Sequence, residues 1–192
     1  MAADTRTPPK YPRTQTVGAQ TLTFRLMEAG DKERVLAFSR ALPHHDLMFL
    51  QRDITDASEV DEWVDDIESG EITTILAVQA DESVAGYATI QRSRLPWSAH
   101  VAELRVLIAT EMRGHGLGRI LTGDAFALAL SEGIEKMMAR MTLDQRGAIA
   151  VFEGIGFRPE ALMRDHVKDR DGNTHDLLVL SHEVARYRDR AV

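Results

Sequence analysis

The chain has 192 residues, 44% of them hydrophobic, and carries 23 Lys and Arg against 30 Asp and Glu. This balance is typical of one globular domain of roughly 100–200 residues. The net charge of −7 argues against nucleic-acid binding, and the absence of cysteine excludes disulfides and cysteine-ligated zinc. No apolar run approaches the ~20 residues of a membrane span, and no secretory signal opens the chain. We therefore expect a cytoplasmic protein without membrane contact.

Residues 1–20 differ in composition from the rest of the chain. They hold three of the six prolines, carry a net positive charge and show no apolar periodicity. Such a segment is typical of a flexible arm, which either has no role of its own or touches a partner. We expect residues 21–192 to form a single domain.

From Thr21 onward the apolar spacing predicts alternating strands and helices. Leu22, Phe24 and Leu26 alternate as in a strand, whereas Val60, Val64 and Ile67 form a helical stripe. The predicted elements, in chain order, are a strand over 21–27, helices over 31–42 and 55–70, strands over 72–79, 84–91 and 100–108, a helix over 117–133, a strand over 136–143, a helix over 145–154, and strands over 160–168 and 174–183. This order predicts an α/β (α+β) fold with a mixed sheet.

The segment Arg113-Gly114-His115-Gly116-Leu117-Gly118-Arg119 joins an apolar strand to an amphipathic helix. Glycines at alternate positions let the chain turn tightly, and the helix then presents unpaired N–H groups with a positive dipole end. Arg113 and Arg119 add positive charge at both ends. This pattern predicts a phosphate or pyrophosphate site.

Several ligands use loops of this kind. A dinucleotide fingerprint needs glycines at offsets 0, 2 and 5, and neither Gly114 nor Gly116 starts such a series. A P-loop needs Gly-Lys-Ser/Thr, which the chain lacks. Two interpretations stay open on the loop alone: the pyrophosphate of coenzyme A, or a turn that binds nothing.

The surrounding motifs favour coenzyme A. Arg113, Gly116 and Gly118 match the pattern Arg/Gln-x-x-Gly-x-Gly/Ala, and residues 145–157 are similar to Asn-x-x-Ala-x-x-x-Tyr-x-x-x-Gly-Phe. In this order the two motifs resemble the GNAT superfamily of N-acetyltransferases. The resemblance spans residues 23–183 and is specific over residues 103–157.

The resemblance implies a mostly antiparallel, twisted mixed sheet with helices on both faces. It also implies two splayed central parallel strands, here residues 100–108 and 136–143, with the pantetheine arm of acetyl-CoA between them. Backbone groups of Val106 and Ile108 would pair with its amides. The coenzyme-binding residues so implied are Val106, Leu107, Ile108, Arg113, Gly114, His115, Gly116, Leu117, Gly118, Arg119, Gln145 and Phe152. For His115 a phosphate contact and a turn without ligand stay equally open.

The same resemblance suggests the catalytic group. Glu103 would be the base that takes a proton from the amine, directly or through water. The alternative is a structural glutamate paired with Arg105 or Arg140. Gln145 replaces the usual Asn, and Phe152 replaces a Tyr that often acts as general acid. Phe has no proton to give, so that role is open.

We therefore expect an N-acetyltransferase that transfers the acetyl group of acetyl-CoA to a primary amine of a small molecule or amino-acid-like acceptor, without a metal. The resemblance also implies that two copies of the protein can form a homodimer. The alternatives are an acyl-CoA-binding sensor or interaction domain and a protein N-acetyltransferase. His44-His45-Asp46 is interpreted as a polar loop bordering the acceptor pocket rather than as a metal cluster. The nine acids of residues 53–71 either steer a cationic amine or form a solvated helix face.

Overall fold

The computed structural model describes residues 8–47, 50–169 and 171–183. Its strands are β1 (Arg13–Val17), β2 (Gln20–Leu26), β3 (Ile72–Val78), β4 (Val84–Arg92), β5 (Val101–Ile108), β6 (Lys136–Thr142), β7 (Arg158–Lys168) and β8 (Thr174–Glu183). Its α-helices are α1 (Lys32–Ala41), α2 (His44–Leu47), α3 (Ala57–Glu68), α4 (Leu117–Ser131) and α5 (Arg146–Ile155). Every predicted element is present, with ends shifted by at most two residues. The apolar spacing was therefore sufficient to place them.

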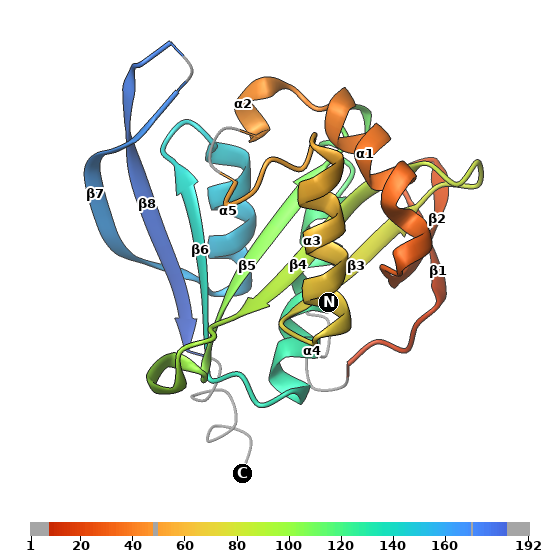
Figure 1. Cartoon of the computed structure of the whole chain (residues 1–192), viewed down its shortest axis with the longest axis horizontal. Coiled ribbons are helices and arrows are strands. Elements are labelled where there is room, and N and C mark those ends of the chain that lie inside the picture. Colours follow the sequence, from red (N-terminus) through yellow and green to blue (C-terminus); the bar gives the residue numbers. More distant parts are fainter. Residues whose placement is uncertain (1–7, 48–49, 170, 184–192) are drawn as a thin grey trace.

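The strands form one sheet in the order β1-β2-β3-β4-β5-β6-β8-β7. Neighbouring strands run antiparallel except β5 and β6, which are parallel. Helices α1 and α3 cover one face, while α4 and α5 lie on the other (Figure 1). The predicted α/β fold with a mixed, mostly antiparallel sheet is confirmed.

The parallel pair separates along its length. Strands β5 and β6 are in register only from Val101↔Lys136 to Glu103↔Met138. Beyond Glu103, β5 stays paired with β4 as far as Ile108, whereas β6 stays paired with β8 as far as Thr142. The two strands diverge toward their C-terminal ends (Figure 1). This confirms the predicted splay and leaves two strand edges facing each other across a gap.

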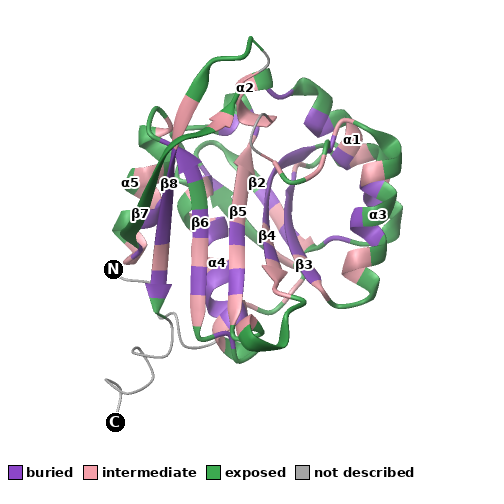
Figure 2. Cartoon of the chain, turned by 60° about the vertical axis from the view of Figure 1, so that its left-hand side comes forward, coloured by how far each residue is buried: buried purple, intermediate pink, exposed green. Residues whose placement is uncertain are grey.

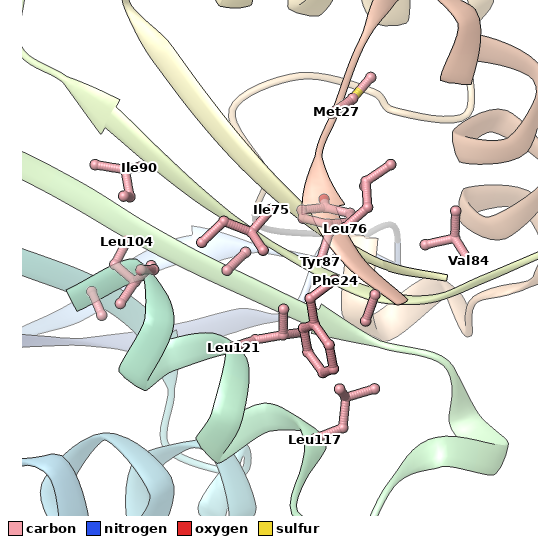
Figure 3. Packing of buried hydrophobic residues seen from close by; sticks show 14 of the residues in the cluster. Phe24, Met27, Ile75, Leu76, Val84, Tyr87, Ile90, Leu104, Leu117 and Leu121 are labelled. Carbon is pink, nitrogen blue, oxygen red and sulfur yellow. The ribbon is translucent and has the colours of Figure 1, made fainter. Parts of the chain in front are cut away.

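The core lies on both sides of the central strands. Phe24, Tyr87 and Leu121 are almost fully buried, as are the apolar side chains of β3 and β4 around them (Figure 3). Burial falls toward the far edge of the sheet, where nearly all of β7 is exposed (Figure 2). No helix of the described ranges is long and apolar enough to cross a membrane.

Two elements were not predicted. Residues 13–17, assigned to a flexible arm, form the edge strand β1, which pairs with β2 from Arg13↔Phe24 to Val17↔Gln20. The polar sequence of β1 hides this strand, because its order comes from the ladder with β2 and the burial of Val17. The flexible-arm prediction is therefore wrong for these residues, and residues 1–7 lie outside the described part. Helix α2 forms within the predicted polar loop 44–47.

Candidate functional site

The gap between β5 and β6 exposes backbone hydrogen-bonding groups. The Ala109 N–H donates to the Ala85 carbonyl, so the odd-numbered residues of β5 bond to β4 (2.9 Å). The even-numbered residues therefore direct their N–H and C=O groups toward β6. For Val106 and Ile108 no β6 partner follows, because the pairing ends at Glu103. The gap thus presents a strand edge that an extended, amide-bearing chain can join.

The glycine loop lies directly after β5 and opens α4. Gly114 and Gly116 have φ of +78° and +85°, a region that favours glycine, and Gly116 is the N-cap of α4. A Cβ built at either glycine meets no atom within 4 Å. The first turn of α4 holds no acidic residue and no side chain caps it. The start of α4 thus combines an uncapped helix N-terminus with open space beside its glycines, as an anion site requires.

The predicted charged residues of the loop take different positions. Arg113 forms an ion pair with Asp46 of α2, and its guanidinium also reaches the Ile108 carbonyl at 3.4 Å. Arg119 is exposed on the first turn of α4. His115 is exposed and lies against the β1–β2 turn, where a Cβ at Gly18 would come within 3.0 Å of its Nδ1. Its ring thus touches the N-terminal hairpin rather than standing alone in the loop.

Helix α2 bridges the open end of the gap. Asp46 pairs with Arg113, which follows β5, and His45 Nε2 lies 2.6 Å from an Asp144 carboxylate oxygen, which follows β6. The two contacts tie α2 to both diverging strands, and Figure 1 shows α2 above their ends. Among the described residues no group of three or more His, Cys, Asp or Glu could hold a metal. His45 thus links α2 to the segment that follows β6.

Glu103 lies where the two strands separate. Its side chain is 13% exposed and contacts Arg105 at 2.8 Å, Arg140 at 3.4 Å and the Gln51 amide at 3.1 Å. Both arginine pairings considered from the sequence are thus present. A carboxylate has about four acceptor positions, so these three contacts leave room for one further donor. The position suits a base at the vertex of the gap, but the carboxylate is also a structural partner of β6.

Gln145 and Phe152 lie at the other side of the gap. Gln145 is the N-cap of α5, and its side-chain oxygen accepts from the Thr142 N–H at 3.2 Å. Phe152 is 5% exposed and packs edge-to-face on Phe157, with ring centroids 5.0 Å apart. Its ring belongs to the core between α5 and the sheet. Leu117 is similarly buried, so its side chain anchors α4.

A small pocket adjoins Glu103 on the face covered by α1 and α3. It lies under residues 50–54, and Tyr87 and Arg105 are among its lining residues. Sequence reasoning missed Tyr87 as a site residue, placed Asp46 only in a loop bordering the acceptor pocket, and named Arg105 only as a partner of Glu103. Tyr87 and Asp46 lie far from the glycine motif in sequence and reach the site only through tertiary packing. For Arg105 a signal existed, because it shares a strand face with Glu103 two positions away.

The acids of α3 are engaged with basic side chains from other segments. Asp61 pairs with Lys32, and Asp66 pairs with both Arg52 and Arg94. Part of the acidic face is therefore neutralised by structural contacts. This arrangement favours the solvated helix face over a surface that steers cations.

The site as a whole fits a thioester coenzyme. The open glycine loop offers N–H groups and arginines for a pyrophosphate, and the unpaired β5 edge offers partners for pantetheine amides. The two features are consecutive in the chain, with the loop beginning where β5 ends. A phosphate-bearing group with an extended amide arm matches this order. A compact nucleotide would contact the glycine loop but not the unpaired edge of β5.

Known proteins support the same interpretation. Residues 39–157 match the Acetyltransferase (GNAT) family. No curated protein sequence matches the chain. Among solved structures, the chain is similar to an acetyltransferase of the GNAT family from Streptococcus pneumoniae, with a TM-score of 0.74, 20% identity, and coverage of 84% of this chain and 99% of that one.

Two further structures carry coenzymes. A phosphinothricin acetyltransferase from Sinorhizobium meliloti in complex with acetyl-CoA gives a TM-score of 0.73 at 19% identity, covering 84% of this chain and 88% of that one. A spermidine N-acetyltransferase from Vibrio cholerae in complex with CoA and spermine gives 0.73 at 18% identity, covering 87% and 98%. At these identities the likeness shows the shared fold.

The family match covers more than half of the chain, and the splayed strands and glycine loop agree with it. The chain belongs to the GNAT acetyltransferase family, and it is an acyltransferase whose cosubstrate is acetyl-CoA.

Proposed function

We propose that the protein transfers the acetyl group of acetyl-CoA to the primary amine of a small-molecule or amino-acid-like acceptor. One observation carries this proposal: the gap between β5 and β6 opens at Glu103, where a pocket on the α1/α3 face adjoins it. A coenzyme site and an acceptor site thus meet at a carboxylate. A binding module needs the first of these sites only.

The coenzyme would be held by the loop and the strand edge. The N–H groups of the first turn of α4, with Arg113 and Arg119, would bind the pyrophosphate. The backbone of Val106 and Ile108 would bond to the pantetheine amides as a neighbouring strand does. Arg113 would exchange its Asp46 partner for a phosphate oxygen. Leu107, His115, Gln145 and Phe152 would support this site from its borders.

Acetyl-CoA supplies an acetyl group activated as a thioester. The acceptor must reach it as a free amine, so an ammonium first loses a proton, and we assign this proton to Glu103, directly or through water. The amine nitrogen then bonds to the carbonyl carbon, the carbon–sulfur bond breaks, and the nitrogen gives one of its two remaining protons to water. A backbone N–H of β5 would stabilise the charge on the carbonyl oxygen. Phe152 supplies no proton, so the departing sulfur takes one from water or another side chain.

A coenzyme-binding sensor is the second candidate. Two features favour it: the ion pairs that engage Glu103, and a phenylalanine where relatives carry a tyrosine acid. Incubation with acetyl-CoA and a panel of primary amines, followed by thiol release and mass spectrometry, separates the two candidates. We expect an acetylated amine in proportion to the thiol released. If no amine raises thiol release above the rate measured without protein, the protein is the coenzyme-binding sensor instead.

We also infer that two copies pair through β7. This edge strand is exposed at nearly every position, and Leu162 and Met163 are 48% and 37% exposed. A long unpaired edge with apolar side chains is a template for a second chain. Light scattering should therefore give twice the 21.4 kDa of one chain. A mass of one chain at micromolar concentration would contradict the inference.

A further inference from the structure

The pocket beside Glu103 has the size of a single functional group. Its volume is about 40 Å³, compared with the ~10–15 Å³ that one water needs. Strands β4 and β5, helix α3 and residues 50–54 enclose it. It can take a group of a few heavy atoms at one end of an acceptor. The rest of an acceptor must lie toward the gap.

The charged side chains that line this pocket are arginines, each paired with an acid outside the lining. Arg52 and Arg105 both line it, whereas no Asp or Glu does within the described part of the chain. Their side chains are only 20% and 22% exposed, so solvent screens these charges less than on an open surface. A cationic group placed here would meet two guanidinium groups. An anionic group would meet complementary charge.

Tyr87 adds a polar group to the lining of the pocket. Its side chain is 2% exposed, and its ring packs on Phe38 and Trp63 with centroids 5.7 and 5.1 Å away. Among the described residues its hydroxyl makes no hydrogen bond, although it lines the pocket. Burial raises the pKa of this hydroxyl, against the opposing effect of Arg105 and Arg52, so it is a protonated donor. Because Tyr87 lines the pocket, this donor is available to an acceptor atom of a bound ligand.

The position of Glu103 sets the orientation of an acceptor. Glu103 and Arg105 lie on the same face of β5, two residues apart, and Gln51 contacts Glu103 while also lining the pocket. An anionic group next to Arg105 therefore places a neighbouring amine toward Glu103 and the gap. The carboxylate there attracts an ammonium. The two charges of an amino acid match this arrangement.

We propose that this pocket is a subsite for the carboxylate of the acceptor, bound by Arg105 and the Tyr87 hydroxyl, so that the acceptors are amino acids rather than polyamines. The inference rests on the proposed acetyl transfer and names its substrate class. Arg52, held by Asp66 and the Glu59 carbonyl, would contribute charge from the pocket wall. Specificity would then come from the two charges of the acceptor, with its side chain left toward solvent.

Matched acceptors test the charge requirement. Phenylalanine would be compared with phenethylamine, lysine with cadaverine, and both pairs with spermidine. We expect kcat/KM for each amino acid to exceed that of its decarboxylated amine by roughly 10- to 100-fold, the size of a charge-assisted hydrogen bond. Equal values within a pair, or a preference for spermidine, would overturn the proposal.

Variants then locate the subsite. Arg105→Gln and Tyr87→Phe should raise KM for the amino acid, by roughly 10- to 100-fold for the arginine, while KM for the matched amine stays within about twofold. Arg105→Lys should recover part of the loss. Lys10→Gln, an exposed cation that precedes β1, is the control and should change neither value. A fall in kcat shared by both acceptors, without the split in KM, would mean that Arg105 acts only through Glu103.

Binding separates failure of the subsite from failure of the transfer reaction. With coenzyme A present, amino acids should raise the melting temperature of the wild type but not of Arg105→Gln. If no acceptor is acetylated and this difference is still seen, the subsite stands and the proposed function falls. If acetylation occurs and no amino acid adds stability or rate over its amine, the function stands and the subsite falls.

Discussion

Glu103 forms ion pairs with two arginines, and these contacts bear on the roles that its carboxylate can have. A carboxylate between Arg105 and Arg140 is held in one place, which suits both a positioned base and a structural link between β5 and β6. The two roles differ in what is lost on removing the charge. A base affects the chemical step, whereas a link affects stability.

Glu103→Gln keeps the shape and the hydrogen bond to Gln51 but removes the charge. If Glu103 is the base, kcat should fall by roughly 10²–10⁴-fold, and the affinity for acetyl-CoA should stay nearly unchanged. Steady-state kinetics and calorimetry measure the two quantities. A lower melting temperature with turnover intact would show that the residue is only a structural partner, and Arg140→Gln should then reproduce that loss.

Phe152 tests whether an acid on α5 is needed. The leaving thiol resembles a free cysteine, with a pKa of about 8.5, and can depart without a strong acid. Phe152→Tyr should therefore leave kcat within about tenfold. Phe152→Ala should cost roughly 3–5 kcal/mol of stability, because the ring is 5% exposed and packs on Phe157.

Kinetics and thermal melts of both Phe152 variants check this account. A gain of several orders of magnitude in Phe152→Tyr would instead mean that the natural protein binds coenzyme without turning it over. Unchanged stability in Phe152→Ala would contradict the observed packing of the ring.

At the scale of elements, α2 links the two halves of the site. Its contacts to Arg113 and Asp144 join the segments that follow β5 and β6. If Arg113 binds the pyrophosphate as proposed, coenzyme binding and the position of α2 would be coupled, because Asp46 already pairs with the same guanidinium. The element that borders the acceptor side would be released when the coenzyme binds.

Asp46→Asn removes this competitor for Arg113. We expect the Kd for coenzyme A to fall by up to about fivefold, the range of an exposed ion pair. Isothermal titration measures it. Glu111→Gln, an exposed acid next to the loop, is the matched control for the general loss of negative charge. An equal gain in both variants, or weaker binding in Asp46→Asn, would show that the Asp46 contact does not compete.

The elements that sequence analysis placed correctly are those with strong periodicity. The stripe of Val60, Val64 and Ile67 predicted α3. Val60 and Val64 are buried, and Ile67 packs against the core. Strand β1 was missed because its polar residues carry no such pattern and depend on β2. The glycine loop was visible because its requirement is local: a tight turn followed by a helix start. The pocket beside Glu103 was not visible in the sequence, because it forms only when residues 50–54 fold over β4 and β5.

At the scale of the whole molecule, the sheet separates two tasks. Helix α4, which opens with the glycine loop, covers one face, and the pocket with Tyr87 and Arg105 lies on the other. The gap between β5 and β6 connects the two faces at Glu103. Under the proposed function, this single interruption in the strand pairing would bring a coenzyme and an acceptor together from opposite sides.

The most direct test of this account is the melting temperature with and without acetyl-CoA, for the wild type and two variants of Gly116. Acetyl-CoA should stabilise the wild type by mass action. Gly116→Val should abolish the shift, because it fills the open space and strains a φ of +85°. Asn adopts a positive φ more readily than Val. A lost shift in Gly116→Asn would therefore come from the side chain that fills the space rather than from backbone strain.

Gly123→Ala, in the interior of α4, is the control. It should keep the full shift and add up to about 1 kcal/mol of stability. The account predicts a shift in the wild type and Gly123→Ala and none in either Gly116 variant. Equal shifts in all four proteins would contradict it, because the glycine loop would then not be the phosphate site.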